Sequence, residues 1–170
     1  METTNQKTTA ALLHFSAMTQ YFFPLGNFIF PIIIWAIAKK DAAYVDHHGR
    51  QAVNFQLSLL LYTLILCFIS IPIFIFTIFK NVPVNAIIND ENFVFNGHNF
   101  NIENITGIVV VGLTAVFIFI MLKAAEFFLV IYATIKAANG ELYKYPLTIN
   151  FIKAENKNTL KNEMPEPSQA

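Results

Sequence analysis

The segment from Asp46 to Gln56 places polar and ionisable side chains at the start of a long apolar stretch. Side chains three and four residues apart share one face of a helix, so a helix here carries a polar stripe. That stripe consists of His47, Gln51, Asn54, Ser58 and Tyr62. A polar stripe on an apolar helix is expected to face protein or water. The residues expected to form a polar mouth and substrate path are His48, Arg50, Gln51, Asn54 and Gln56.

A second group of candidate residues lies within the last apolar stretch. Lys123 and Glu126 are three residues apart and therefore share a helix face, roughly 15 to 20 Å from Lys136 at 1.5 Å per residue. Charged groups at membrane depth are costly and are functional candidates by default. Two interpretations stay open: a locally neutralised structural pair, or an intramembrane charge site. In the second, His14 on the first helix meets Glu126 or Asn54 as a proton relay; the alternative is that His14 makes an interhelical hydrogen bond and has no further role.

Metal, cofactor and enzyme chemistry find little support in the sequence. Adjacent histidines such as His47 and His48 cannot easily both bind one metal from a single helix turn, and no Cys or carboxylate cluster completes a tetrahedral set. No nucleophile with a base, phosphate loop or pair of catalytic carboxylates is visible. The lone Cys67 lies in an apolar run and is expected to be a small buried hydrophobe. We therefore expect no metal, no cofactor and no enzymatic activity.

Composition indicates a membrane protein whose main partner is the lipid bilayer. Of the 170 residues, 55% are hydrophobic and only 13% are charged, against about 25% charged in a typical soluble domain. The formal net charge is +0, with 11 basic and 11 acidic residues, so no basic stripe recruits nucleic acid.

The apolar pattern predicts an all-α, integral membrane four-helix bundle over residues 1–153, followed by a disordered tail over 154–170. The predicted helices cover residues 8–23, 25–39, 46–79 and 104–139, and residues before 8 are expected to be frayed. The first two are shorter than the roughly 20 residues that span a bilayer, so they form either one kinked span or a short hairpin. Turn residues from Pro24 to Asn27 favour the hairpin. Asp46 is expected to cap the third helix, and Asn139 with Gly140 to end the fourth.

Charge distribution predicts the orientation of the chain. Basic residues cluster in the first polar loop and after the last apolar segment, which places both clusters on the cytoplasmic side of the cytoplasmic membrane. These residues are Lys39, Lys40, Arg50, Lys136, Lys144 and Lys153. The favoured hairpin then puts both termini in the cytoplasm, whereas a single kinked span would put the N-terminus outside. Between the two long helices, residues 92–102 alternate around Asn96-Gly97, which predicts a small extracytoplasmic β-hairpin, with a mobile loop as the alternative.

Four short motifs carry a resemblance to a known family. They are His48-Gly49, Asn54-Phe55-Gln56, Asn139-Gly140-Glu141 and Tyr145-Pro146-Leu147. With these motifs the chain resembles, over about residues 10–153, the bacterial Tic-twenty-like family of four-helix membrane proteins. That family is similar to the small membrane subunit of the chloroplast inner-envelope protein translocon.

The resemblance implies a non-enzymatic protein that assists polypeptides across or into the cytoplasmic membrane. Its polar mouth would supply hydrogen-bond partners to a peptide backbone entering hydrocarbon. Two alternatives are a small ion- or proton-coupled carrier or sensor that uses Lys123, Glu126 and His14, and a bacteriocin export or immunity accessory or scaffold. Expected partners are a polypeptide substrate, other membrane proteins, or further copies of the chain as a homo-oligomer.

Overall fold

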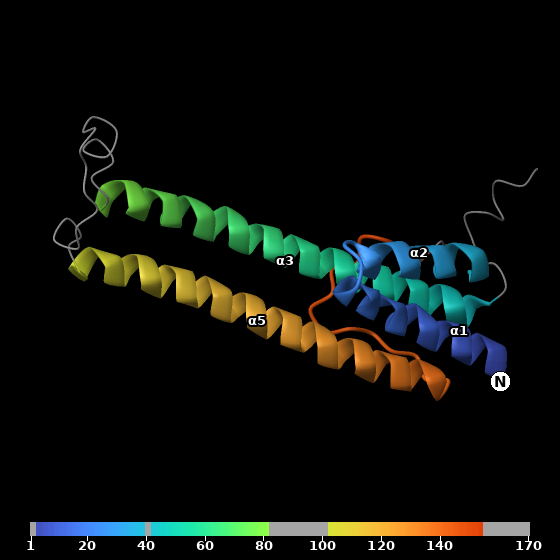
Figure 1. Cartoon of the computed structure of the whole chain (residues 1–170). Helices are drawn as coiled ribbons and strands as arrows, with labels where there is room; N and C mark the ends of the chain where they lie inside the picture. Colours follow the sequence, from blue (N-terminus) through green and yellow to red (C-terminus); the bar gives the residue numbers. More distant parts are fainter. Residues whose placement is uncertain (1–2, 40–41, 82–101, 155–170) are drawn as a thin grey trace, which may run out of the picture. The chain divides into compact units, whose positions relative to one another are not determined.

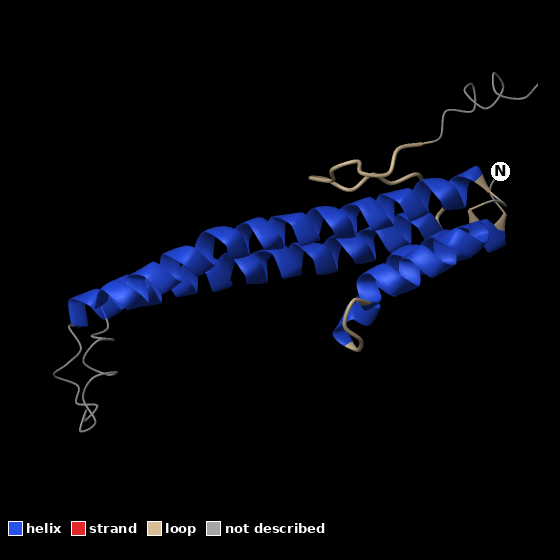
Figure 2. Ribbon diagram, turned by 90° about the horizontal axis from the view of Figure 1, so that it is seen from above, coloured by secondary structure: helices blue, strands red, loops and turns tan. Residues whose placement is uncertain are grey.

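The computed structural model describes the chain except for residues 1–2, 40–41, 82–101 and 155–170 (Figure 1). Its described part is helical and holds four α-helices, one 3-10 helix and no strand (Figure 2). The helices are α1 (Thr4–Phe15), η1 (Ser16–Tyr21), α2 (Gly26–Ala38), α3 (Ala43–Asn81) and α5 (Ile102–Ala138). The all-helical class is thereby confirmed. Nearly all of the predicted β-hairpin, and the predicted tail from residue 155 onward, lie outside the described residues.

Helix α1 begins earlier than the sequence pattern predicted. Thr3 and Gln6 form a capping box, in which the Thr3 side chain accepts from the Gln6 N–H and the Gln6 side chain accepts from the Thr3 N–H. Residues 4–7 are therefore helical, and the prediction that they fray was wrong. After Phe15 the chain tightens into η1, where the hydroxyl of Ser16 donates to the Leu13 carbonyl at 2.9 Å. Such local hydroxyl bonds compete with the α-helical pattern, which replaces the end of the predicted 8–23 helix with a 3-10 turn.

Helix α2 follows a tight turn and packs against the elements before it. Leu25 has a left-handed backbone conformation with φ 62°, and α2 contacts both α1 and η1. Gly26 permits this approach, because a Cβ there would lie 2.6 Å from the Thr19 hydroxyl oxygen and 2.8 Å from Thr19 backbone atoms. Pro31 lies inside α2 and is buried.

Helices α3 and α5 are both long and apolar enough to cross a membrane. The candidate spans are Ala43–Phe76 and Val109–Ala138, whose most apolar 18-residue stretches have mean hydropathies of 2.7 and 2.2. Because α3 begins at Ala43, Asp46 lies in its first turn and is not the predicted N-cap; there it still complements the helix dipole. Helix α5 ends as predicted, since Gly140 has φ +84° and the Glu141 N–H donates to the Lys136 carbonyl at 3.0 Å.

The chain divides into two units. Unit 1 comprises Met1–Leu57 and Val130–Ala170, so it holds α1, η1, α2, the first turns of α3 and the last turns of α5. Unit 2 comprises Ser58–Leu129. Unit 1 contains most of the buried side chains, both apolar and polar. Unit 2 exposes large apolar side chains, such as Phe68 at 76%, and it also exposes Cys67, which corrects the prediction that this thiol is buried.

Candidate functional site

Unit 1 is built around a buried chain of three polar side chains from three separate segments. The imidazole Nε2 of His14, on α1, lies 2.8 Å from Nδ1 of His48 on α3. The other nitrogen of His14, Nδ1, lies 2.9 Å from the hydroxyl of Tyr145 in the segment after α5. Both imidazoles are fully buried and Tyr145 is 2% exposed. Sequence reasoning placed His14 and His48 in different candidate sites, whereas the structure joins them.

The direction of hydrogen bonding along this chain depends on which ring nitrogen of His14 carries its hydrogen. A neutral imidazole has one N–H donor and one acceptor nitrogen. If the Tyr145 hydroxyl donates to His14 Nδ1, then His14 Nε2–H donates to His48 Nδ1, and His48 Nε2 carries the remaining hydrogen. That atom is buried and makes no hydrogen bond of ordinary geometry, although the backbone of Glu141 is close enough to His48 to interact with it electrostatically. In this arrangement, the Glu141 carbonyl is the acceptor for the hydrogen on His48 Nε2.

Burial keeps His14 neutral. Desolvation is the main reason that the pKa of His14 falls from 6.5 to about 3, and the neighbouring His48 and His47 lower it further. A charged imidazolium would have two donors and no acceptor nitrogen, so it could not accept from Tyr145. Protonation of His14 would therefore require the Tyr145 hydroxyl to act as the acceptor of this hydrogen bond.

The first turns of α3 also hold α2, through a hydrogen bond to the Asp46 carboxylate, which is itself paired with Arg50. Arg50 Nη1 pairs with Asp46 Oδ2, and the indole N–H of Trp35 on α2 donates to the other carboxylate oxygen at 3.0 Å. Directly beside this contact, a Cβ at Gly49 would lie 2.2 Å from Trp35 Cδ1, so only glycine lets the indole approach α3 this closely. Arg50, predicted to line a polar mouth, is neutralised by Asp46.

Three amide side chains in the first turns of α3, those of Gln51, Asn54 and Gln56, are buried, and two of them have partners within unit 1. Asn54 Nδ2 donates to the Ile152 carbonyl at 3.0 Å, and Asn54 Oδ1 accepts from the Ile152 N–H at 2.8 Å. Gln56 Oε1 accepts from Asn27 Nδ2 at 2.8 Å. Gln51 differs, because its buried Oε1 has no partner. In unit 1, the predicted mouth residues His48, Gln51, Asn54 and Gln56 therefore belong to a packed polar core.

Aromatic residues complete this core, and sequence reasoning did not assign them to the site. The hydroxyl of Tyr44 donates to the Ala137 carbonyl at 2.8 Å, which ties α3 to α5. Tyr145 stacks on Phe55 with 4.0 Å between ring centroids. The only signal in the sequence was that Tyr145 belonged to a distinctive Tyr-Pro-Leu motif.

In unit 2, the predicted pair of Lys123 and Glu126 is present. Lys123 Nζ lies 2.8 Å from Glu126 Oε2. The Glu126 side chain is 1% exposed and that of Lys123 is 39% exposed.

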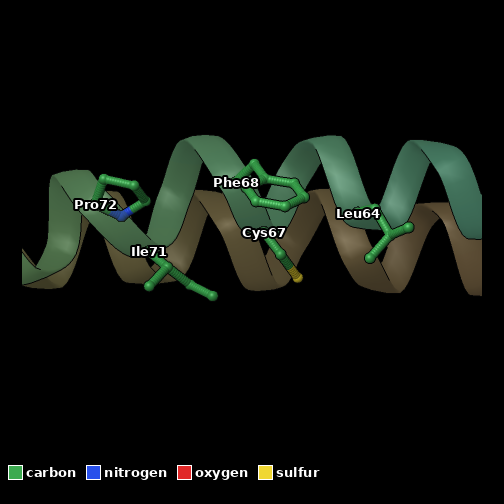
Figure 3. Close-up of a pocket in the computed structure, with 5 residues that line it drawn as sticks. All are labelled: Leu64, Cys67, Phe68, Ile71 and Pro72. Carbon is green, nitrogen blue, oxygen red and sulfur yellow. The ribbon is translucent and has the colours of Figure 1, made fainter.

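The exposed face of α3 in unit 2 carries an apolar hollow of about 260 Å³. Figure 3 shows its lining side chains, which all come from α3. They are Leu64, Cys67, Phe68, Ile71 and Pro72. Its walls are apolar, so the hollow suits hydrocarbon. The lining side chains supply no oxygen or nitrogen ligand for a hard metal ion. Within the described ranges, no group of three or more His, Cys, Asp or Glu side chains is arranged to hold a metal ion.

Comparison with protein families matches residues 5–152 to the MamF/MmsF family, described as the magnetosome magnetite crystal formation protein family. The chain belongs to this family. The match covers the polar core and both long helices. No curated protein and no solved structure matches the chain.

Membership of the MamF/MmsF family corrects two predictions. The resemblance to the Tic-twenty-like family was wrong, because the matching family is that of magnetite crystal formation. The function drawn from that resemblance, polypeptide translocation, was wrong for the same reason. The carrier, sensor, and export or immunity alternatives find no support in this family either. The membrane prediction holds: this MamF/MmsF protein has two helices long and apolar enough to cross a bilayer.

Proposed function

We propose that this protein works in a magnetosome membrane, where it takes part in the formation of magnetite crystals without catalysing a reaction. The observation that carries the proposal is the family match over residues 5–152. The apolar exteriors of α3 and α5 support the membrane location, since such surfaces are stable in hydrocarbon and not in water.

The polar core of unit 1 supports a structural part in this function. Each neighbouring segment of unit 1 is tied to α3 by a buried or half-buried hydrogen bond: α1 through His14, α2 through Trp35, the end of α5 through Tyr44, and the last described segment through Asn54. Helix α3 is therefore the element on which unit 1 is assembled. In our proposal, this core holds the ends of the two membrane helices in a fixed arrangement while mineral grows at the membrane.

Three finer features belong to the same proposal. The helices form a bundle in the membrane, both termini face the cytoplasm, and copies of the chain associate. The basic residues near the start of α3 and around the end of α5 support this orientation. Self-association is supported by the low burial of the two apolar helices, whose most hydropathic windows are 0% and 11% buried within the molecule.

Complementation tests the function. A magnetosome-forming bacterium that lacks its own member of the family would receive this chain, and crystal diameters would be measured by electron microscopy. We expect the intact chain to restore crystal size. A core variant, Gly49→Leu, should fail because Trp35 occupies the space, whereas Gly112→Leu, with nothing within 4 Å, should succeed. Unchanged crystals despite equal amounts of intact chain in the magnetosome membrane would overturn the proposal.

A further inference from the structure

The outer surface of α2 and of the turn before it exposes many large apolar side chains. At the turn, Phe22 is 81% exposed, Phe23 61% and Leu25 64%. Along α2, Ile33 is 50% exposed and Ile37 is 74% exposed. Soluble surfaces rarely carry contiguous apolar patches of this kind, so another apolar phase must cover this one.

The length of α2 limits how far this helix can reach into a bilayer. The helix has 13 residues, which is about 20 Å at 1.5 Å per residue, and the hydrocarbon core of a bilayer is about 30 Å thick. It is an apolar helix too short to be a candidate span. Helix α2 can therefore enter the bilayer but cannot cross it.

The end of α2 remote from the turn has the features of a headgroup anchor. Trp35 lies near this end, with its N–H bonded to Asp46, and Lys39 Nζ lies 5.3 Å from the centroid of the indole ring. Lys7, from the start of α1, lies close to Gly140 at the end of α5. Trp and Lys are enriched where a helix meets the headgroups, so this end suits the membrane surface.

At the turn, in contrast, polar groups are hydrogen-bonded within the protein, which suits a hydrocarbon environment. An unpaired polar group there would cost several kcal/mol, but several polar groups at this end have partners in unit 1. Asn27 donates to Gln56, the Thr19 hydroxyl donates to the Ser16 carbonyl at 2.7 Å, and the Gly26 N–H donates to the Phe23 carbonyl at 3.1 Å. The exposed side chains that remain at the turn are mainly aromatic and aliphatic.

We propose that α1, η1 and α2 form a re-entrant hairpin seated in a single leaflet of the bilayer. The Phe22–Phe23 turn lies among the acyl chains, and the end that carries Trp35 and Lys39 lies among the headgroups. The partner of this surface is thus lipid. The proposal concerns membrane insertion alone and does not depend on the role in magnetite formation.

Depth-dependent fluorescence quenching tests the hairpin, because Trp35 is the single tryptophan of the chain. The full chain would be reconstituted in phosphatidylcholine vesicles with bromine either near the carbonyl end or near the methyl end of the acyl chains. Trp35 should be quenched most by the shallow bromine. In the double variant Trp35→Phe/Phe22→Trp the order should reverse, with the deep bromine quenching most. Trp35→Phe/Phe68→Trp, placed in the apolar part of α3, is the control for a deep position.

Each other outcome overturns the hairpin. Shallow quenching from both Trp35 and position 22 would mean that the segment crosses the bilayer. Quenching of position 22 by aqueous iodide would place the turn outside the membrane. Protection from both iodide and bromine would mean that protein, such as a second copy, covers it.

A second measurement keeps Trp35 in place, in case its loss disturbs folding. Cys67→Ser removes the single cysteine, and Phe22→Cys adds a thiol at a position that is 81% exposed. A membrane-impermeant maleimide should label this thiol from neither side of sealed vesicles, and should label it fully once detergent is added. Labelling from either side before detergent is added would contradict the proposal.

Discussion

The buried amides of α3 illustrate how single residues hold unit 1 together. Asn54 bonds both the N–H and the carbonyl of Ile152, whereas the Oε1 of Gln51, one helix turn earlier, has no partner. Removing a buried partner costs the desolvation penalty of the group left behind, about 1–3 kcal/mol for each. The two side chains should therefore respond oppositely to apolar replacement.

We predict that Asn54→Leu lowers the free energy of unfolding by about 3 kcal/mol, because two backbone groups of residue 152 lose their partners. Gln51→Met, the matched control, should leave stability within about 1 kcal/mol of the parent or raise it, since it removes an unpaired oxygen at similar volume. Thermal unfolding in detergent micelles measures both. Equal losses from the two variants would show that these bonds do not stabilise unit 1.

The titration of His14 predicts a pH dependence of stability. Its pKa falls from 6.5 in the unfolded chain to about 3 in the folded protein, so the unfolded chain binds more protons between these values. Stability should be full above pH 6.5 and decrease as the pH falls from 6.5 towards 3. At pH 5 the loss is about 2 kcal/mol. His14→Gln removes this titrating group and should reduce the slope measured by unfolding at pH 7.5 and pH 5; an unchanged slope would contradict this assignment.

At the scale of elements, α2 docks on α3 through a contact that only glycine permits. A Cβ at Gly49 would lie 2.2 Å from Trp35 Cδ1 and 2.4 Å from Cγ, which are atoms of the ring body and cannot yield without moving α2. A Cβ at Gly112, on α5, would have no atom within 4 Å. Substitution of Gly112 is therefore a control for substitution of Gly49.

We predict that Gly49→Ala destabilises the protein by about 1–3 kcal/mol, the usual range for overpacking a tight contact. Gly112→Ala should be neutral or stabilising by up to about 1 kcal/mol, because alanine is the better helix former. Blue-shifted or broadened Trp35 fluorescence in Gly49→Ala would report the displaced indole. A Gly49→Ala protein as stable as the parent, with unchanged Trp35 fluorescence, would show that α2 does not rest on this glycine.

Features that are determined by neighbouring residues could be predicted from the sequence, whereas features that depend on tertiary packing could not. The long apolar helices and the stop at Gly140 follow from composition and a short motif, and the contact of Lys123 with Glu126 follows from i, i+3 spacing. The pairing of His14 with His48 and with Tyr145 joins residues 34 and 131 positions apart, so it depends on tertiary packing. The 3-10 turn of η1 was missed because hydroxyl bonds, and not hydropathy, decide it.

The same distinction explains why the motif-based function was wrong. The motifs behind the Tic-twenty-like resemblance contain Gly49 and Asn54. Gly49 leaves space for Trp35, and Asn54 hydrogen-bonds the Ile152 backbone. Tyr145, another motif residue, hydrogen-bonds His14. These motifs describe how unit 1 packs, and packing residues do not specify an activity.

At the scale of the whole molecule, the proposed hairpin has a consequence for membrane shape. An insertion that occupies one leaflet and not the other enlarges that leaflet, so binding becomes sensitive to curvature. We predict that fluorescently labelled protein reaches a higher surface density in small vesicles than in large ones. Replacing Phe22 and Phe23 by serine, at positions 81% and 61% exposed, should reduce this preference. Equal densities at all diameters for the intact chain would contradict the prediction.

The most direct test of the account is to grow magnetite on membranes that contain this protein and no other. Ferrous and ferric iron would be co-precipitated with vesicles that carry the purified full chain, with vesicles that carry Gly49→Leu, and with empty vesicles, and crystal diameters would be measured by electron microscopy. We predict that the intact chain shifts and narrows the diameter distribution and that Gly49→Leu does so less. A distribution identical to that of empty vesicles, with the intact chain folded in the membrane, would contradict a direct role in crystal formation.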